Sequence, residues 1–282
     1  MSEIARARPW LGTIVSIRAR GASQASVRDA IDAAFVEIAA VHERMSFHDP
    51  DSDLSRLHRA GGEPVAIDGR TREVIRQALA LAEESEGVFD PTVAAEFVAD
   101  AVLPRPSGSS CVDPQASWRD IELLDAPFAR LCRPLWIDLG GIAKGYAADR
   151  ALDVLRRRGI ASATVNAGGD IARFGECPEP IAVDPGSGDG AAAVIELQDA
   201  AVATSSTAPA DPRTHRAHWH GRHRRPVPPG RSATVVASSC CIADALTKIV
   251  LADADIGIAM LNRRDAMAWM FDGNAWTEIG HA

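Results

Sequence analysis

The residues from 136 to 150, WIDLGGIAKGYAADR, constrain the fold of this chain more than any other stretch. An apolar run ends at Asp138, two glycines follow, and apolar residues then recur at helical spacing until Gly159. This order predicts a strand, a tight turn and a helix. The first amides of a helix lack partners and attract anions, and glycines let a ligand approach the backbone closely. The stretch therefore favours phosphate binding.

Two charged side chains of this stretch extend the phosphate hypothesis. Lys144 would add a point charge to the same anion, and Asp138 would take a metal ion or a ribose or base donor. An ordinary strand-to-helix connection with a surface lysine explains the same residues. The stretch matches neither the phosphate-loop pattern nor the Gly-x-Gly-x-x-Gly dinucleotide fingerprint, so the rest of the chain has to decide.

Composition excludes several classes of protein. The 282 residues, 46% of them hydrophobic, can bury a large core as one domain or two intimate lobes. The net charge of −8 argues against a nucleic-acid-binding protein. No apolar stretch approaches about eighteen residues, so stable membrane insertion is not expected, and the N-terminus lacks a leader pattern, which predicts a cytoplasmic protein. The five cysteines lack metal-ligand spacing and are expected to be reduced.

Hydrophobic periodicity predicts both strands and helices along the chain. Strands are expected over residues 11–19, 64–67, 163–166, 181–184, 193–197, 201–207 and 232–238, with the pair 181–184 and 193–197 antiparallel. Helices are expected from Ser26 until the chain reaches His42, and over residues 71–87, 142–159 and 241–251. A short helix is expected after a capping Ser52, a loop over 104–114, and a hairpin turn at Asp272-Gly273.

Three other places carry candidate chemistry, each with a plain structural alternative. Pro91 forces Asp90 into an extended conformation and presents its carboxylate, although a turn aspartate would look the same. Asp244 and Thr247 offer oxygens to a hard cation from one helix face, whereas an Asp244–Lys248 ion pair within the helix explains the same spacing. Residues 211–231 hold six arginines and four histidines, which suit either a solvated loop or a phosphate or partner contact.

Taken together, these motifs resemble the ApbE family of flavin transferases, which move FMN from FAD onto a threonine or serine of an acceptor protein. The resemblance covers nearly the whole chain. Its motifs occur in the family's order: Leu11-Gly12-Thr13, Met45-Ser46-Phe47, Phe89-Asp90-Pro91-Thr92, the run from Asp138 to Asp149, Asn166-Ala167-Gly168-Gly169-Asp170, Ala203-Thr204-Ser205 and Ala243-Asp244-Ala245-Leu246.

The resemblance implies an α+β fold of mixed, mainly antiparallel sheets with packed helices. Residues 1–282 would form one unit of two lobes with the ligand in the groove between them. It also implies roles for individual residues. The FAD pocket would be formed by Met45, Phe89, Asp90 and Pro91, with Asp138 and Lys144 contacting the flavin nucleotide. Magnesium would be held against the pyrophosphate by the Gly141 carbonyl, Asp244 and Thr247. Asp244 would also be a catalytic residue.

The implied activity is magnesium-dependent FAD:protein FMN transfer to an acceptor flavoprotein of an electron-transfer system, with release of AMP. Two alternatives remain open at this point. If water replaces the acceptor hydroxyl, the same site is an FAD pyrophosphatase that yields FMN and AMP. A non-catalytic FAD-binding maturation factor would share the binding residues but leave FAD intact.

Two departures from the family pattern bear on the site. The family has a threonine four residues after the aspartate, where this chain has Lys248, and Thr247 stands at three. Either Thr247 reaches the metal, or the Lys248 ammonium sits where the cation should be. The family's histidine-containing segment before the strand at Ser232 has no clean counterpart in residues 211–215 or 218–226, and His218 is the first candidate for a catalytic histidine.

Overall fold

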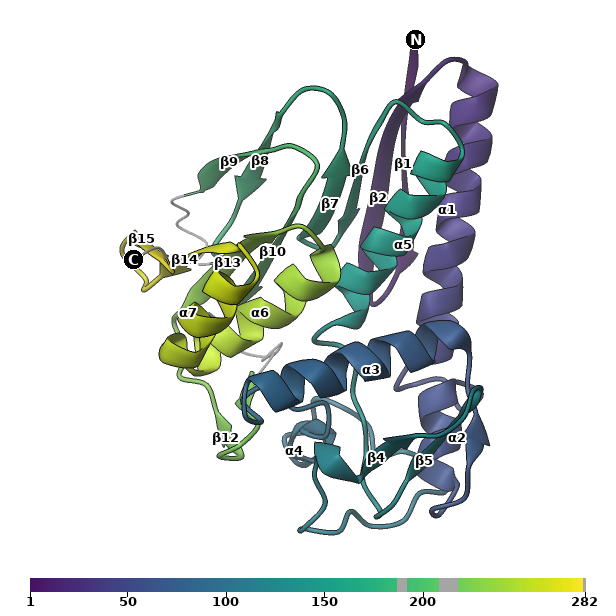
Figure 1. Cartoon of the computed structure of the whole chain (residues 1–282), viewed down its shortest axis with the longest axis vertical. Helices are drawn as coiled ribbons and strands as arrows, with labels where there is room; N and C mark the ends of the chain where they lie inside the picture. Colours follow the sequence, from purple (N-terminus) through teal and green to yellow (C-terminus); the bar gives the residue numbers. More distant parts are fainter. Residues whose placement is uncertain (187–191, 208–217, 281–282) are drawn as a thin grey trace.

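Antiparallel pairing dominates the computed structural model, which describes residues 1–186, 192–207 and 218–280. Within these residues, eight strands form one sheet in the order β1-β2-β6-β7-β10-β13-β14-β15, with every neighbouring pair antiparallel (Figure 1). The strands are β1 (Ser2–Trp10), β2 (Thr13–Gly21), β6 (Ser162–Ala167), β7 (Asp170–Phe174), β10 (Ala201–Ser206), β13 (Ser232–Ala237), β14 (Met267–Phe271) and β15 (Trp276–Ile279).

Helices cover one face of this sheet and a hairpin covers part of the other. The helices are α1 (Gln24–Met45), α5 (Ala143–Arg157), α6 (Cys240–Ala252) and α7 (Ala254–Arg263), and the hairpin is β8 (Glu179–Val183) with β9 (Ala193–Leu197). Side chains alternate between the faces of a strand. Accordingly Ala172 packs with α1 and α5, whereas its neighbour Ile171 packs against Ile181 and Leu197 of the hairpin.

A smaller lobe lies beside the helices at the lower end of the view in Figure 1. It contains a three-stranded sheet, β3-β5-β4, and short helices. Its elements are α2 (Asp53–Arg59), β3 (Val65–Ala66), α3 (Gly69–Glu84), α4 (Ala94–Ala99), the 3-10 helix η1 (Trp118–Asp120), β4 (Ile121–Leu123) and β5 (Phe128–Leu131). One buried apolar cluster runs from Leu81 and Ile137 to Val235 and Leu246 of the large sheet and α6. That continuity supports the single-unit interpretation of residues 1–282, which stays a prediction.

The α+β class with mainly antiparallel sheets is confirmed, and most predicted elements are present. The Ser52 hydroxyl accepts the Ser55 amide at 3.1 Å and caps α2 as expected. Helix α1 begins earlier than predicted, because Ser23 is its N-cap and Ser26 is the third helical residue of a capping box. The strand expected over residues 11–19 is present as β2, but it begins only at Thr13, because Leu11 and Gly12 form a turn at φ +57° and +69°. It is also the second strand, since β1 precedes that turn and was not predicted.

The strand expected just before Asp138 is absent. Residues 133–139 pair with no strand, and the Asp138 amide instead donates to the Pro91 carbonyl at 2.8 Å. A short apolar run indicates burial, but it does not distinguish a strand from a buried irregular segment. The helix after the glycines is confirmed as α5, and Gly159 follows its end at φ +72°. None of the helices in the described ranges is long and apolar enough to cross a membrane.

Candidate active site

The central motif builds a close crossing between helices α5 and α6. A Cβ atom on Gly145 would overlap the Cys240 carbonyl group and lie 2.8 Å from the Cys241 amide nitrogen, so only glycine fits. Asp149, one turn further along α5, accepts the amides of Cys240 and Cys241 at 2.9 Å each and caps the start of α6. The backbone of α6 is thereby fixed against α5, with Asp244 facing Lys144.

Four ionisable side chains meet at this crossing, and we refer to Lys144, Asp170, Asp244 and Lys248 as the four-charge cluster. The Lys144 ammonium donates to Asp170 Oδ2 and lies 3.6 Å from Asp244 Oδ2. The Lys248 ammonium donates to Asp244 Oδ1 and, at 2.9 Å, to the Asp244 carbonyl oxygen. Both carboxylates are buried, whereas the lysine side chains remain 19% and 16% exposed, so only the cations face outward.

The electrostatics of the cluster keep Asp244 and Lys144 charged. Burial opposes ionisation of Asp244, but Lys144 and Lys248 outweigh it and hold the pKa of Asp244 below its ordinary value. Burial likewise opposes the Lys144 ammonium, but Asp244 and Asp170 outweigh it and raise the pKa of Lys144. Asp170 differs, because burial and the negative charge of Asp244 raise its pKa despite Lys144.

Asp170 is the member of the cluster to which sequence reasoning gave no role, although its motif was recognised. It begins β7, directly after the Gly168-Gly169 turn. At Gly168, with φ +69°, a Cβ atom would lie 2.5 Å from Thr13 Oγ1, so this turn packs onto the turn between β1 and β2. Asp170 Oδ1 is buried without a hydrogen-bond partner in the described part of the chain. A strand followed by Gly-Gly-Asp is the signal that could have marked it.

The phosphate-binding amides predicted at the start of α5 already have partners within the chain. The Ala143 amide donates to the Leu139 carbonyl at 2.8 Å, and the Gly145 amide donates to Asp244 Oδ2 at 3.2 Å. Any anion at this place would therefore depend mainly on the two lysine ammonium groups rather than on the helix amides.

Two of the three groups predicted to hold magnesium, the Asp244 carboxylate and the Thr247 hydroxyl, do not fit that ion as they are placed. Asp244 Oδ1 carries the Lys248 ammonium, and Oδ2 accepts the Gly145 amide. The Thr247 hydroxyl donates to the Asp244 carbonyl at 2.6 Å and lies 2.7 Å from Ser205 Oγ. Magnesium needs about six oxygens at roughly 2.0–2.1 Å. Among the described residues, no group of three or more His, Cys, Asp or Glu side chains is arranged to hold a metal ion.

Of the residues predicted to contact the flavin nucleotide, Phe89 lies beside Gly141 and Lys248. A Cβ atom on Gly141 would lie 3.5 Å from the Phe89 ring and 3.9 Å from Lys248 Cε, which places these three residues together. Met45, at the end of α1, belongs to the same buried apolar cluster as Phe89. Asp138 accepts the Gly140 amide at 3.1 Å, and burial raises its pKa despite that bond.

Asp90, by contrast, is held as the anchor of a turn. It accepts the Thr92 amide at 2.8 Å and the Thr92 hydroxyl at 2.7 Å, and Arg224 lies 3.3 Å from its other oxygen. Burial raises the pKa of Asp90, partly offset by Arg224. Pro91, which follows it, binds the Asp138 amide through its carbonyl oxygen. Asp90 and Pro91 therefore support the segment that carries Asp138, and their contact with a ligand stays a prediction.

The basic segment is folded onto its own chain where the structure describes it. Strands β11 (Trp219–His220) and β12 (Arg225–Pro226) form a short hairpin. In its turn, Arg222 donates to the Glu86 carbonyl at 2.7 Å, and Arg224 donates to the Thr92 carbonyl at 3.1 Å. Residues 208–217 lie outside the described residues, and they include Arg213, His215 and Arg216 of the predicted loop or contact segment.

His218, the first candidate for a catalytic histidine, lies within electrostatic reach of the four-charge cluster. Burial, followed by the charge of Lys248, lowers the pKa of His218 to about 4, although a hydrogen bond with the Ser206 backbone opposes the shift. The imidazole is thus neutral at pH 7 and able to accept a proton, but it is a weak base.

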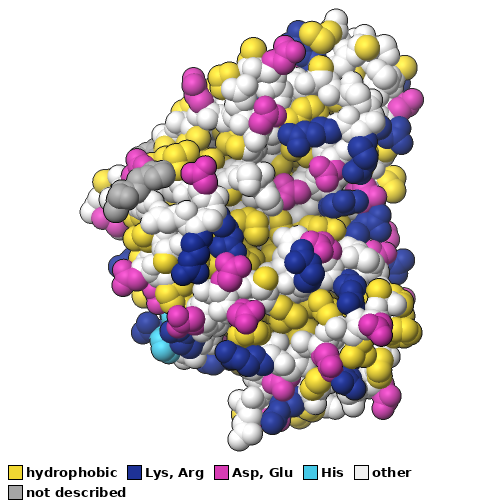
Figure 2. All heavy atoms as spheres, viewed as in Figure 1, with side chains coloured by type: hydrophobic (Ala, Val, Ile, Leu, Met, Phe, Trp, Pro, Cys, Tyr) yellow, Lys and Arg dark blue, Asp and Glu magenta, His cyan; other side chains and the backbone are white. Residues whose placement is uncertain are grey.

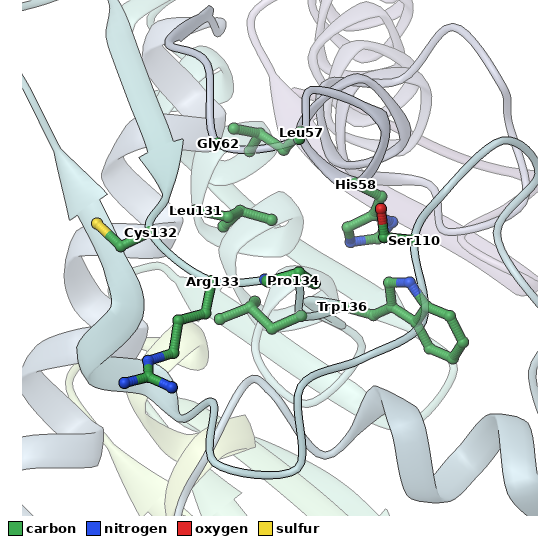
Figure 3. A pocket seen from close by; sticks show the side chains of 11 residues that line it. Leu57, His58, Gly62, Ser110, Leu131, Cys132, Arg133, Pro134 and Trp136 are labelled. Carbon is green, nitrogen blue, oxygen red and sulfur yellow. The ribbon is translucent and has the colours of Figure 1, made fainter.

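Two described pockets lie away from these residues. One has a cavity volume of about 50 Å³ and lies between α2 and the segment that precedes Asp138, with His58, Leu131, Arg133 and Trp136 in its wall (Figure 3). The other, of about 350 Å³, opens between the large sheet and β8. None of the predicted site residues lines either pocket, and a ligand groove between the lobes stays a prediction. Figure 2 shows positive and negative side chains interspersed over the face in view.

His58 supports one prediction about pH. Its Nε2 accepts the Ile137 amide at 2.9 Å, and burial lowers the pKa of His58 to about 4. An unfolded histidine has a pKa of about 6.5, so His58 contributes stability above that pH and loses it as the pH falls toward 4. Melting temperatures of the parent and His58→Leu should therefore converge as the pH falls from 6.5 to 4. Parallel curves would contradict the neutral, buried state.

Comparisons with known proteins agree over most of the chain. A model of the ApbE family matches residues 11–271. The FAD:protein FMN transferase of Treponema pallidum is 28% identical over 232 residues, which are 72% of this chain and 64% of that protein. The chain thus spans just under two thirds of that relative. The FAD:protein FMN transferase of Vibrio cholerae is 29% identical over 245 residues, with 78% of this chain and 72% of that protein covered.

Solved structures share the fold at low sequence identity. The ApbE protein of Thermotoga maritima matches with a TM-score of 0.82 and 24% identity, covering 99% of this chain and 97% of that chain. The apo flavinyl transferase ApbE of Pseudomonas stutzeri matches with a TM-score of 0.81 and 19% identity, covering 99% and 95%.

Proposed function

This chain belongs to the ApbE family, and on that premise we propose that it is an FAD:protein FMN transferase. It would move the FMN half of FAD onto a threonine or serine hydroxyl of an acceptor flavoprotein in an electron-transfer system. The observation that carries the proposal is the four-charge cluster, in which two cations are held in place by buried carboxylates before any substrate arrives. Preorganised charge of this kind is the main contribution a protein makes to phosphoryl transfer.

The proposed reaction exchanges a phosphoanhydride bond for a phosphoester bond. The acceptor oxygen bonds to the phosphorus on the FMN side of the pyrophosphate, and the bond from that phosphorus to the bridging oxygen breaks. AMP leaves with the bridging oxygen, and the hydroxyl proton passes to a base, for which His218 is the first candidate. Lys144 and Lys248 neutralise the phosphate oxygens, as their partly exposed ammonium groups suggest.

The flavin side of the substrate would lie toward Phe89 and Gly141. Phe89 offers a ring beside the small Gly141, where an aromatic isoalloxazine can stack. Met45 and Pro91 would complete the apolar wall, with Asp90 as its support. Asp138 would accept a donor from the flavin nucleotide through the carboxylate oxygen that does not bind Gly140. Magnesium, when bound, would supply charge neutralisation, but the placement of its expected ligands gives it no support.

The test is to incubate purified protein with FAD, magnesium and an acceptor flavoprotein that carries a reactive threonine. Covalent flavin fluorescence on the acceptor, with one AMP released per flavin, is the expected result. Asp244→Asn is the matched control, since it keeps the shape of the side chain and removes the anion. Free FMN and AMP without labelled acceptor would instead favour an FAD pyrophosphatase. FAD that binds and stays intact would favour a maturation factor, and either outcome would overturn the transferase.

A further inference from the structure

Lys248 and Lys144 are the only two lysines in the 282-residue sequence. The chain has 30 lysines and arginines in total, and the other 28 are arginines. Both lysines belong to the four-charge cluster and share the carboxylate of Asp244. A lysine ammonium is a compact point charge, whereas arginine presents a wide planar fork. The cluster therefore uses the basic side chain that most resembles a small cation.

The Lys248 ammonium makes the contacts that a bound cation would make. It contacts two oxygens of one residue, Oδ1 and the carbonyl oxygen of Asp244. Its Cε lies within 3.9 Å of the Cβ position on Gly141, the residue whose carbonyl is the second expected metal ligand. Lys248 thus occupies the space between the residues that were expected to share the ion.

The third expected ligand already has hydrogen-bond partners within the protein. The Thr247 side chain is fully buried, and its hydroxyl donates a hydrogen bond to the Asp244 carbonyl oxygen and contacts the Ser205 hydroxyl. A divalent ion would have to displace the Lys248 ammonium from Asp244 Oδ1 and then find further oxygens to complete its shell. Displacing this ammonium from its buried carboxylate partner costs free energy that binding of the new ion must offset.

From these contacts we propose that the Lys248 ammonium takes the place of the divalent cation, so that the protein binds the pyrophosphate of FAD without a metal ion. This inference rests on the proposed function for the identity of the ligand. Two lysine charges flank Asp244 and present a fixed pair of cations to the two phosphates. The two carboxylates balance these charges in the free protein, so the site needs no ion to be stable before the substrate binds.

The presence of only two lysines permits a direct test by NMR on the intact protein. Lysine labelled with 13C at the ε carbon gives two ε signals, and Lys144→Arg identifies them. Titration with millimolar MgCl2 alone should leave the Lys248 signal in place, and FAD in EDTA should shift it. Adding excess magnesium to the FAD complex should change the FAD dissociation constant by less than about twofold, since no direct metal contact is gained.

The opposite results separate the two proposals. A Lys248 signal that moves with magnesium alone, or FAD binding that appears only with magnesium, would overturn the metal-free site while leaving the transferase proposal intact. An FAD titration that shifts neither signal in any buffer would overturn the proposed function, and the magnesium titration alone would still decide whether a metal displaces Lys248.

A designed reversal provides the second readout. Lys248→Thr removes the ammonium and supplies a hydroxyl oxygen beside Asp244, so FAD affinity should become magnesium-dependent by about tenfold or more, the value of one charge-assisted contact. Lys248→Met removes the ammonium without supplying an oxygen and should weaken FAD binding equally with magnesium and with EDTA. Equal magnesium dependence in the parent and in Lys248→Thr would count against the proposal. The parent NMR titration requires no variant to fold.

Discussion

Replacement of Asp244 by alanine is expected to lower the free energy of unfolding by about 3–5 kcal/mol and to abolish FAD turnover. The Asp244 carboxylate is fully buried and is shared by two lysine ammonium groups and one backbone amide. Removal of this anion leaves Lys144 with Asp170 as its one carboxylate partner among the described residues, and it leaves the Lys248 ammonium without its carboxylate. Urea denaturation followed by circular dichroism measures the loss of stability, and chromatography of FAD, FMN and AMP measures turnover.

Two controls separate this effect from the loss of any acidic residue. Asp255→Ala, at an exposed position of the neighbouring helix α7, should change stability by less than about 0.5 kcal/mol. The double variant Asp244→Ala/Lys248→Met should regain part of the stability lost by Asp244→Ala, because it also removes the stranded cation. A loss below about 1 kcal/mol for Asp244→Ala, as in a surface ion pair, would contradict the burial of the cluster.

Replacement of Gly145 by alanine is expected to cost about 1–3 kcal/mol or more, although alanine is the better helix former. The added methyl group would overlap backbone of Cys240 at the start of α6, and backbone cannot rotate away as a side chain can. The helices must separate, which moves Asp244 from the Gly145 amide and Lys144 and should weaken FAD binding together with stability. Thermal unfolding and an FAD titration measure the two effects.

The matched control for Gly145 is Gly69, which also lies in a helix. A Cβ atom there would have no neighbour within 4 Å, and the backbone is not in the left-handed region. Gly69→Ala should therefore leave stability unchanged or raise it by up to about 1 kcal/mol. If Gly145→Ala behaves like Gly69→Ala, the close crossing of α5 and α6 is not what fixes the cluster.

Local patterns in the sequence predicted much of the fold correctly. The periodicity of α1, α5 and α6 and the Ser52 cap depend on residues within a few positions of each other. The antiparallel pair β8 and β9 joins strands that are neighbours along the chain. The order of motifs indicated the family for the same reason, since each motif is short. Errors occurred where neighbours in sequence do not decide the outcome. The apolar run before Asp138 binds a distant proline carbonyl instead of joining a sheet.

The sequence by itself determined the order of the family's motifs and the chemical groups that they carry. These groups include the two lysines, and Lys248 follows Asp244 by one helical turn. It left open whether Thr247 or Lys248 would face the ion site, because residues three and four positions after Asp244 lie on the same side of a helix. Only the tertiary structure decided this, by burying Thr247 against Ser205 of β10 and bringing Asp170 and Lys144 to the same carboxylate. Contacts between residues 26 and 100 positions apart bring Lys144 to Asp170 and to Asp244, and no local pattern encodes them.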